Sequence, residues 1–195
     1  MWWVAIEGGR IVCEGGALMA IDPHRIGSSG ARSSGLARLR RLHGLPALAV
    51  TSLVLTVLSQ ANIGRIVFAS KQALIDMQTA LSWDGFLSVL ASWRPADFEA
   101  YWGHYGPDLL HPFVYGLTGA TVMGWIFESR GHGDRWNGLM LLVPVAGALD
   151  LVENTCHAVT ISSYPAVPYW TFAVGNPAAV LKWTLVVIAL VAALL

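Results

Sequence analysis

Four long runs of apolar residues alternate with shorter polar segments along the chain after residue 44. The runs cover residues 45 to 63, 109 to 127, 138 to 161 and 176 to 195. Each is close to the roughly 20 residues that an α-helix needs to cross a bilayer. The pattern therefore predicts an all-α integral membrane protein whose residues 45 to 195 form a four-helix transmembrane bundle.

The segment between the first two runs predicts further helix outside the bilayer. Leu74, Met77 and Leu81 recur at helical spacing. Pro95 opens a second, shorter helical pattern that carries a stripe of aromatic residues. The stripe consists of Phe98, Tyr101, Trp102 and Tyr105. An aromatic stripe beside a membrane is typical of an interfacial helix, so we expect an extracytoplasmic interfacial helical segment here.

Composition agrees with a membrane location. Hydrophobic residues make up 55% of the 195 residues and charged residues only 12%, against roughly 25% charged in an ordinary soluble domain. The formal net charge is zero, which gives no indication of a nucleic-acid partner. The bilayer itself is the partner that the composition predicts.

The basic residues indicate the orientation. The segment before the first run carries Arg25, Arg32, Arg38, Arg40 and Arg41. The positive-inside rule puts this end in the cytoplasm, and four crossings return the C-terminus there. Residues 1 to 44 are predicted to be a cytoplasmic tail, largely disordered because "GSSGARSSG" is a flexible composition, with a hairpin as an option for "MWWVAIEGGRIVCEGG". Met19 is an alternative start.

Ionisable residues interrupt two of the apolar runs at helical spacing. The third run contains Asp150, Glu153, Asn154 and His157 within about 100° of arc. The second run, together with the residues just before it, carries His104, Asp108, His111 and Tyr115 within about 60° of arc. At about 1.5 Å per residue, most of these residues and Lys182 lie between the midplane and about 13 Å outside it. We therefore expect them to face one polar cavity in the outer half of the bilayer, since ionisable groups avoid lipid.

Two interpretations of this polar cluster use the same residues. In the first, Lys182 pairs with Asp150 or Glu153 as an architectural ion pair. In the second, the cavity binds a small amphipathic or lipid-like ligand, and Asp150, Glu153 and Lys182 serve as catalytic acid and base groups. The ligand-binding residues are then Asp108, His111, Tyr115, Asn154 and His157. Intramembrane ionisable residues are functional by default, which favours the second interpretation.

A metal site is a third interpretation. Its ligands would be Asp108, His111, Glu153 and His157, as i, i+3 and i, i+4 pairs. The nearby Lys182 would repel a cation, so no metal and no cofactor are predicted. The glycines of "EGGRIVCEGG" do not follow a dinucleotide or phosphate-loop pattern.

Three stretches carry a resemblance to a family. "DLLHPFVYGL", "VPVAGALDLVENTCH" and "YPAVPYWTFAVGNPAAVLKW" are similar to an uncharacterised family of small four-span bacterial inner-membrane proteins with D-x-x-x-P-x-x-Y, D-x-x-E-N and L-K-W motifs. The matching positions are Asp108, Pro112, Tyr115, Asp150, Glu153, Asn154, Lys182 and Trp183. The resemblance implies the fold and a location in the bacterial inner membrane, and it implies no reaction.

We therefore predict a multi-pass membrane protein that binds a small amphipathic or lipid-like ligand in a buried polar cavity, with acid and base chemistry as an option. The alternatives are a metal-dependent membrane enzyme and a structural or assembly subunit whose lysine and carboxylate cluster is architectural.

Overall fold

The computed structural model describes residues 4–7, 10–13, 35–43 and 45–195 of the chain, which divides into two units at Ser34 and Gly35. In the first unit, strand β1 (Val4–Glu7) pairs antiparallel with strand β2 (Arg10–Cys13), with Val4 opposite Cys13. The hairpin considered for this stretch is therefore present. The disorder predicted for residues 14–34 falls outside the described residues.

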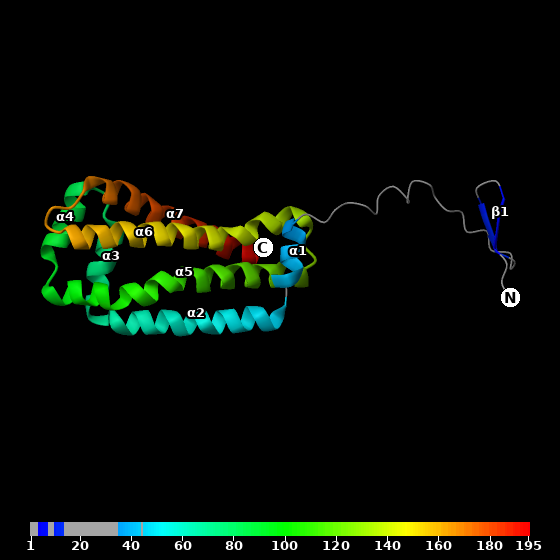
Figure 1. Ribbon diagram of the computed structural model, residues 1–195, viewed down its shortest axis with the longest axis horizontal. Coiled ribbons are helices and arrows are strands. Elements are labelled where there is room, and N and C mark those ends of the chain that lie inside the picture. Colours follow the sequence, from blue (N-terminus) through cyan, green and yellow to red (C-terminus); the bar gives the residue numbers. More distant parts are fainter. Residues whose placement is uncertain (1–3, 8–9, 14–34, 44) are drawn as a thin grey trace. The chain divides into compact units, whose positions relative to one another are not determined.

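The second unit is built on four long helices that run side by side (Figure 1). They are α2 (Pro46–Ile66), α5 (Pro95–Ser129), α6 (Leu142–Ser163) and α7 (Tyr169–Leu194). Helix α5 packs between α2 and α6, and α7 packs against α6. All regular elements described in this unit are helical, so the all-α prediction is confirmed for it.

Among the described helices, three are long and apolar enough to cross a membrane, by length and composition. They are Pro46–Ile66, Asp134–Ser163 and Tyr169–Leu194. Helix α5 is longer than any of them, but His111, Pro112 and Tyr115 lower the mean hydropathy of its apolar part. Crossing by α5, and with it the four-span bundle, stays a prediction.

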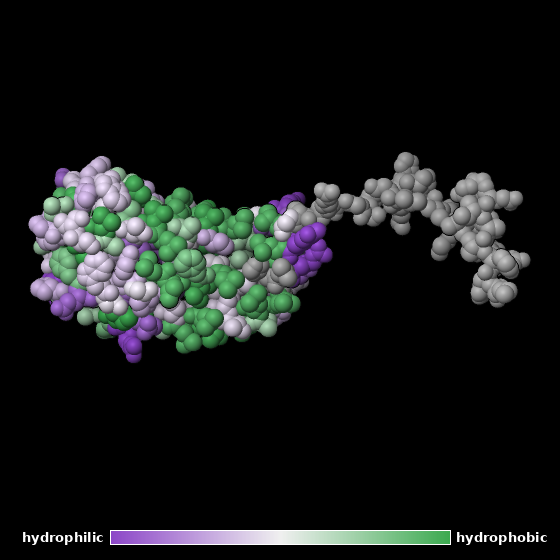
Figure 2. Space-filling model, in the orientation of Figure 1, coloured by the Kyte–Doolittle hydropathy of each residue, from purple (hydrophilic) through white to green (hydrophobic). Residues whose placement is uncertain are grey.

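The surface of the four-helix region is apolar. On α2, Val57 and Leu58 are 59% and 61% exposed, and Val180 and Leu190 of α7 are 58% and 62% exposed. Figure 2 shows hydrophobic residues over the middle of this unit and hydrophilic residues at its two ends. Exposed apolar area of this extent marks a surface that meets lipid or another protein.

Two helix boundaries differ from the predicted ones. The fourth run was expected to begin at Asn176, but α7 already begins at Tyr169, and Pro177 lies inside it. The helix of the second run was expected to be separate from the interfacial helix before it. Instead, residues 95–129 form one continuous helix with Pro107 and Pro112 inside. Proline removes one backbone hydrogen bond, and packing against neighbouring helices offsets that loss over a long apolar helix.

The predicted tail also ends earlier than expected. Helix α1 (Gly35–His43) belongs to the second unit, so this part of the predicted tail is structured. Its Arg40 side chain is buried, donates hydrogen bonds to the backbone oxygens of Phe127 and His132 at 2.8 and 2.6 Å, and pairs with Glu128 at 2.9 Å. A cation placed on the last carbonyls of α5 stabilises the helix end, which the arginine count alone does not reveal.

The opposite end of the four-helix region is closed by short helices. They are the 3₁₀ helix η1 (Phe68–Ser70), α3 (Lys71–Thr79) and α4 (Trp83–Ser92). Phe86 and Leu90 of α4, and Trp93 directly after it, pack with Tyr101 of α5 and Ile161 of α6 in a buried apolar cluster. At the other end, the 3₁₀ helix η2 (Asp134–Leu141) carries Met140 into a second apolar cluster with Phe127 and Ala189. The polar residues of the long helices lie between these two clusters.

The first turn of α5 gives a pH-dependent prediction. Asp97 accepts hydrogen bonds from the Arg94 backbone at 2.8 Å and from its guanidinium at 3.1 Å. The Arg94 side chain, helped by the Ser70 hydroxyl, holds the pKa of Asp97 well below its usual value. A lowered pKa in the folded state contributes stability at neutral pH that is lost as the pH falls below about 4, the unfolded value.

We therefore expect Asp97→Asn to be less stable than the wild type by about 1 kcal/mol at neutral pH, the usual size of a lost cap. The difference should shrink when thermal unfolding in detergent is repeated at a pH of about 3, which is below the usual aspartate pKa. Glu99→Gln is the control, because Glu99 is exposed on the same helix. A difference between Asp97→Asn and wild type that is independent of pH would contradict this account.

Candidate functional site

A cavity of about 830 Å³ lies among the four long helices and is covered at one end by α3. Its polar part is lined by Asp108, His111 and Tyr115 of α5, by Asp150, Asn154 and His157 of α6, and by Lys182 of α7. The sequence predicted that these residues share one cavity, and the structure brings them together. A cavity of this volume is within the range of ligand pockets, roughly 300–1,000 Å³.

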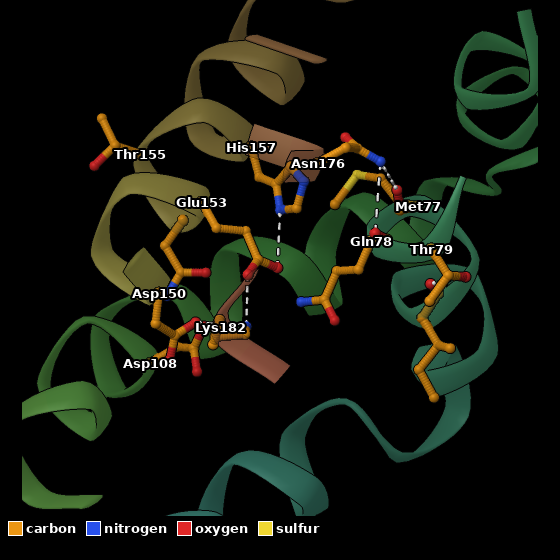
Figure 3. A network of polar contacts seen from close by, with 12 residues as sticks. Met77, Gln78, Thr79, Asp108, Asp150, Glu153, Thr155, His157, Asn176 and Lys182 are labelled. Atoms are coloured by element: carbon orange, nitrogen blue, oxygen red, sulfur yellow. Dashed lines mark hydrogen bonds and ion pairs between the residues drawn. The ribbon is translucent and has the colours of Figure 1, made fainter. Parts of the chain in front are cut away.

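Lys182 is the centre of the polar cluster. Its Nζ atom donates a hydrogen bond to Asp150 Oδ1 at 2.8 Å and lies 2.5 Å from Glu153 Oε2 (Figure 3). The predicted pairing of the lysine with a carboxylate is therefore present, and it involves both acids. Because Asp150 and Glu153 are three residues apart on α6, one turn of helix presents both carboxylates to the same point on α7.

The second oxygen of Asp150 has its own partner. Tyr115 of α5 donates its hydroxyl hydrogen to Asp150 Oδ2 at 3.0 Å. Asp150 thus ties α5, α6 and α7 together at one height. Such a charge-assisted pair of hydrogen bonds fixes the carboxylate against the cavity wall.

Glu153 is placed differently from Asp150. Its side chain is fully buried and does not line the cavity. Its other oxygen, Oε1, lies 3.9 Å from His157 Nδ1. Contact with a ligand in the cavity therefore falls to Asp150 and Lys182, and Glu153 acts on a ligand through Lys182 or His157.

Apart from Glu153 Oε2, which lies against Lys182, three polar atoms of α6 are buried without a hydrogen-bond partner among the residues that the structure describes. They are Glu153 Oε1, Asn154 Nδ2 and His157 Nε2. Asn154 and His157 are 5% and 2% exposed, and both line the cavity. A buried polar group without a partner costs about 1–3 kcal/mol, so these atoms favour a ligand over a purely architectural cluster. An architectural ion pair was expected to have its hydrogen bonds completed by Asn154 and Tyr115; Tyr115 bonds to Asp150, whereas the Asn154 side chain has no partner among the described residues.

The four residues named for a metal site are not gathered as ligands. His111 Nδ1 lies 3.0 Å from Ser59 Oγ of α2, while His157 faces Glu153. In the part of the chain that the structure describes, no three His, Cys, Asp or Glu side chains are close enough together to hold a metal ion. The i, i+3 and i, i+4 spacings on α5 and α6 therefore do not converge.

The rest of the cavity is apolar and runs toward the end of the helices that carries α1. It is lined there by Val122 and Met123 of α5 and by Val186, Leu190 and Ala193 of α7. The polar groups thus lie toward the α3 end, where Val67, Leu74 and Met77 also line the cavity, and the part toward α1 is lined mainly by apolar side chains. This division matches an amphiphile in shape and polarity.

Asn176 was not predicted to belong to the site. Its Nδ2 atom donates to the backbone oxygens of Met77 at 3.3 Å and of Ala80 at 3.0 Å, at the end of α3 (Figure 3). It thereby ties α7 to the helix that covers the cavity. The sequence "NP" at this position favours a turn, so only the tertiary structure reveals this role.

Comparisons with known proteins give no match: no protein-family model, no curated protein and no solved structure matches the chain. The resemblance to four-span inner-membrane proteins thus stays a prediction that rests on the three motifs. The cavity and its residues are therefore the only indications of function.

Proposed function

We propose that the chain is a four-span membrane protein that holds a lipid-like ligand in its cavity. The head of the ligand lies among the polar lining residues Asp108, Asp150 and Asn154, and its hydrocarbon part lies along α7 toward Ala193. The observation that carries the proposal is the cavity of about 830 Å³, with its polar groups toward one end and mainly apolar side chains toward the other. Monomeric soluble proteins rarely expose apolar surface of the extent found on these helices, which supports a membrane location for the cavity.

The proposed orientation places α1 and η2 on the cytoplasmic side of a bacterial inner membrane. The basic residues Arg38, Arg40, Arg41, Arg130 and Arg135 all belong to that end of the four-helix region. The positive-inside rule then puts the polar end of the cavity in the outer half of the bilayer. A ligand would enter sideways from the outer leaflet.

Binding is the function that the geometry supports best. The unpartnered atoms of Asn154 and His157 support a ligand over an architectural role, and the dispersed histidines give no support to metal-dependent catalysis. Acid and base chemistry by Asp150, Glu153 and Lys182 on the bound ligand remains an extension of this proposal.

Filling the cavity tests the proposal. Gly64 of α2 lines the cavity, and a Cβ atom built on it meets nothing within 4 Å. Gly64→Phe therefore places a bulky ring on the cavity wall at a position where the Cβ atom itself is unobstructed. Ala61→Phe is the matched control, because Ala61 is exposed on the same helix and does not line the cavity.

Native mass spectrometry of the protein from a mild detergent is the measurement. We expect a reproducible bound mass on the wild type and on Ala61→Phe, and at least about a tenfold loss of occupancy on Gly64→Phe, equivalent to about 1.4 kcal/mol. A bound mass that survives in Gly64→Phe, or a wild-type chain that carries only bulk phospholipid, would remove the proposal.

A further inference from the structure

We propose that the cavity selects an amphiphile whose head is a protonated amine, with Asp108 as the carboxylate that receives it. This inference rests on the proposed function and names the class of its ligand. It follows from the charges around the cavity, from the partners those charges already have, and from the unpartnered Nε2 atom of His157.

Three carboxylates surround one buried cation. Lys182 is engaged by Asp150 and Glu153, with both contacts at 2.8 Å or less. Asp108 lines the same cavity, and its side chain is 20% exposed. It has an ion-pair contact with His104, whose Nε2 lies at 4.0 Å, and His104 Nδ1 lies 2.8 Å from the backbone oxygen of Ala100. The cluster therefore holds more carboxylates than lysines, and Asp108 is the carboxylate outside the Lys182 pair.

The other cation on the cavity wall does not compensate Asp108. Lys71 begins α3, where it is exposed at the covered end of the cavity. Charges on exposed flexible side chains are screened by solvent and contribute little. Lys182 would repel an unshielded cation, but its charge is already paired with Asp150 and Glu153. A ligand that brings its own positive charge can therefore pair with Asp108, whereas a phosphate or carboxylate head would add to the excess of carboxylates.

His157 supplies an independent reason for a ligand with hydrogen-bond donors. Its Nδ1 atom faces the Glu153 carboxylate, so we assign the proton to Nδ1, which leaves Nε2 as an acceptor. That Nε2 atom is buried and has no partner among the described residues. An ammonium head carries several donors and no acceptor, which fits both Nε2 and the Asp108 carboxylate.

Aromatic rings complete the polar end of the cavity. Tyr101, Tyr115 and Trp183 all line it. Lys182 Nζ lies 5.3 Å from the centre of the Trp183 ring, so this wall already accommodates one ammonium group. Ammonium groups are attracted to the faces of such rings, and alcohols are attracted much less.

The test compares three probes with the same hydrocarbon chain: dodecylamine, 1-dodecanol and dodecyl phosphate. The amine is protonated at neutral pH, since the pKa of an alkylamine is about 10. Each probe is titrated against the full chain in non-ionic detergent, and occupancy is measured by native mass spectrometry. We expect dodecylamine to bind at least about tenfold more tightly than the other two, the size of one charge-assisted hydrogen bond.

Variants of Asp108 then test whether its carboxylate causes the preference for the amine. Asp108→Asn should bind dodecylamine no better than 1-dodecanol, and Asp108→Glu, which keeps the charge, should retain the preference. Glu99→Gln, an exposed carboxylate on the same helix, is the control and should behave as wild type. Equal binding of amine and alcohol, tighter binding of the phosphate, or a preference unchanged in Asp108→Asn would overturn the amine head and leave the proposed function standing. Failure of all three probes to bind would count against the inference and the proposed function together.

Discussion

Replacement of Lys182 by methionine is expected to lower the free energy of unfolding by about 3–5 kcal/mol, the usual consequence of removing one partner of a buried ion pair. The Lys182 side chain is 7% exposed, and those of Asp150 and Glu153 are 10% and 0% exposed. Methionine has a similar length but no charge. Both carboxylates would then lose the cation that compensates them, in a region where water does not replace it.

The measurement is thermal or denaturant unfolding in detergent, followed by circular dichroism. A triple variant separates charge from packing: Lys182→Met combined with Asp150→Asn and Glu153→Gln removes the charges of both acids with the lysine. We expect the triple variant to recover most of the lost stability, because neutral buried groups cost far less than unpaired charges. If Lys182→Met alone leaves stability unchanged, the cluster does not contribute to folding as described.

The meeting of Lys182 with Asp150 and Glu153 could be predicted from the sequence because it depends on two regular quantities. Helical periodicity puts the two acids on one face of α6, and the constant rise per residue puts Lys182 at the same height on α7. Apolar runs also predicted α2 and α6 to within a few residues. Both signals are local, and tertiary packing leaves them intact.

The parts of the site that the sequence did not predict depend on long-range partners. Asn176 contacts the end of α3, about a hundred residues earlier in the chain, and Arg40 reaches the end of α5. No local pattern encodes such contacts. Which carboxylate faces the cavity was equally hidden: Asp108 and Asp150 line it and Glu153 does not, because a rotation of α6 by a fraction of a turn decides that. The catalytic and binding roles of these residues stay predictions.

The predicted starts of α5 and α7 were wrong for a related reason, and both lie near prolines. Pro107 and Pro177 lie beside the predicted starts of the second and fourth runs, at residues 109 and 176, and both lie inside longer helices. In α5 a second proline contributes to packing, since Pro112 lies against Gly147 of α6. Residues that break a helix in isolation are thus used where two helices approach each other.

That approach of α5 and α6 makes Gly147 the second sensitive position. A Cβ atom at residue 147 would lie 2.8 Å from the backbone oxygen of Pro112, and one at Gly116 would lie 3.4 Å from Pro144 Cα. Backbone atoms cannot rotate away as a side chain does, so Gly147→Ala forces the helices apart. Three residues from each member of this contact, Tyr115 donates to Asp150 at 3.0 Å between the same two helices, and separation of the helices would stretch this hydrogen bond.

We expect Gly147→Ala to destabilise the protein by about 1–3 kcal/mol, the usual cost of overpacking, although alanine is the better helix former. Gly64→Ala is the matched control: nothing lies within 4 Å of its added Cβ atom, so it should stabilise by about 0.5–1 kcal/mol through helix propensity alone. Unfolding of both variants in the same detergent gives the comparison. Opposite signs would establish that close contact between α5 and α6 holds Tyr115 against Asp150, whereas stabilisation by both substitutions would mean that the two helices have room to spare and that the cavity wall is not fixed by their contact.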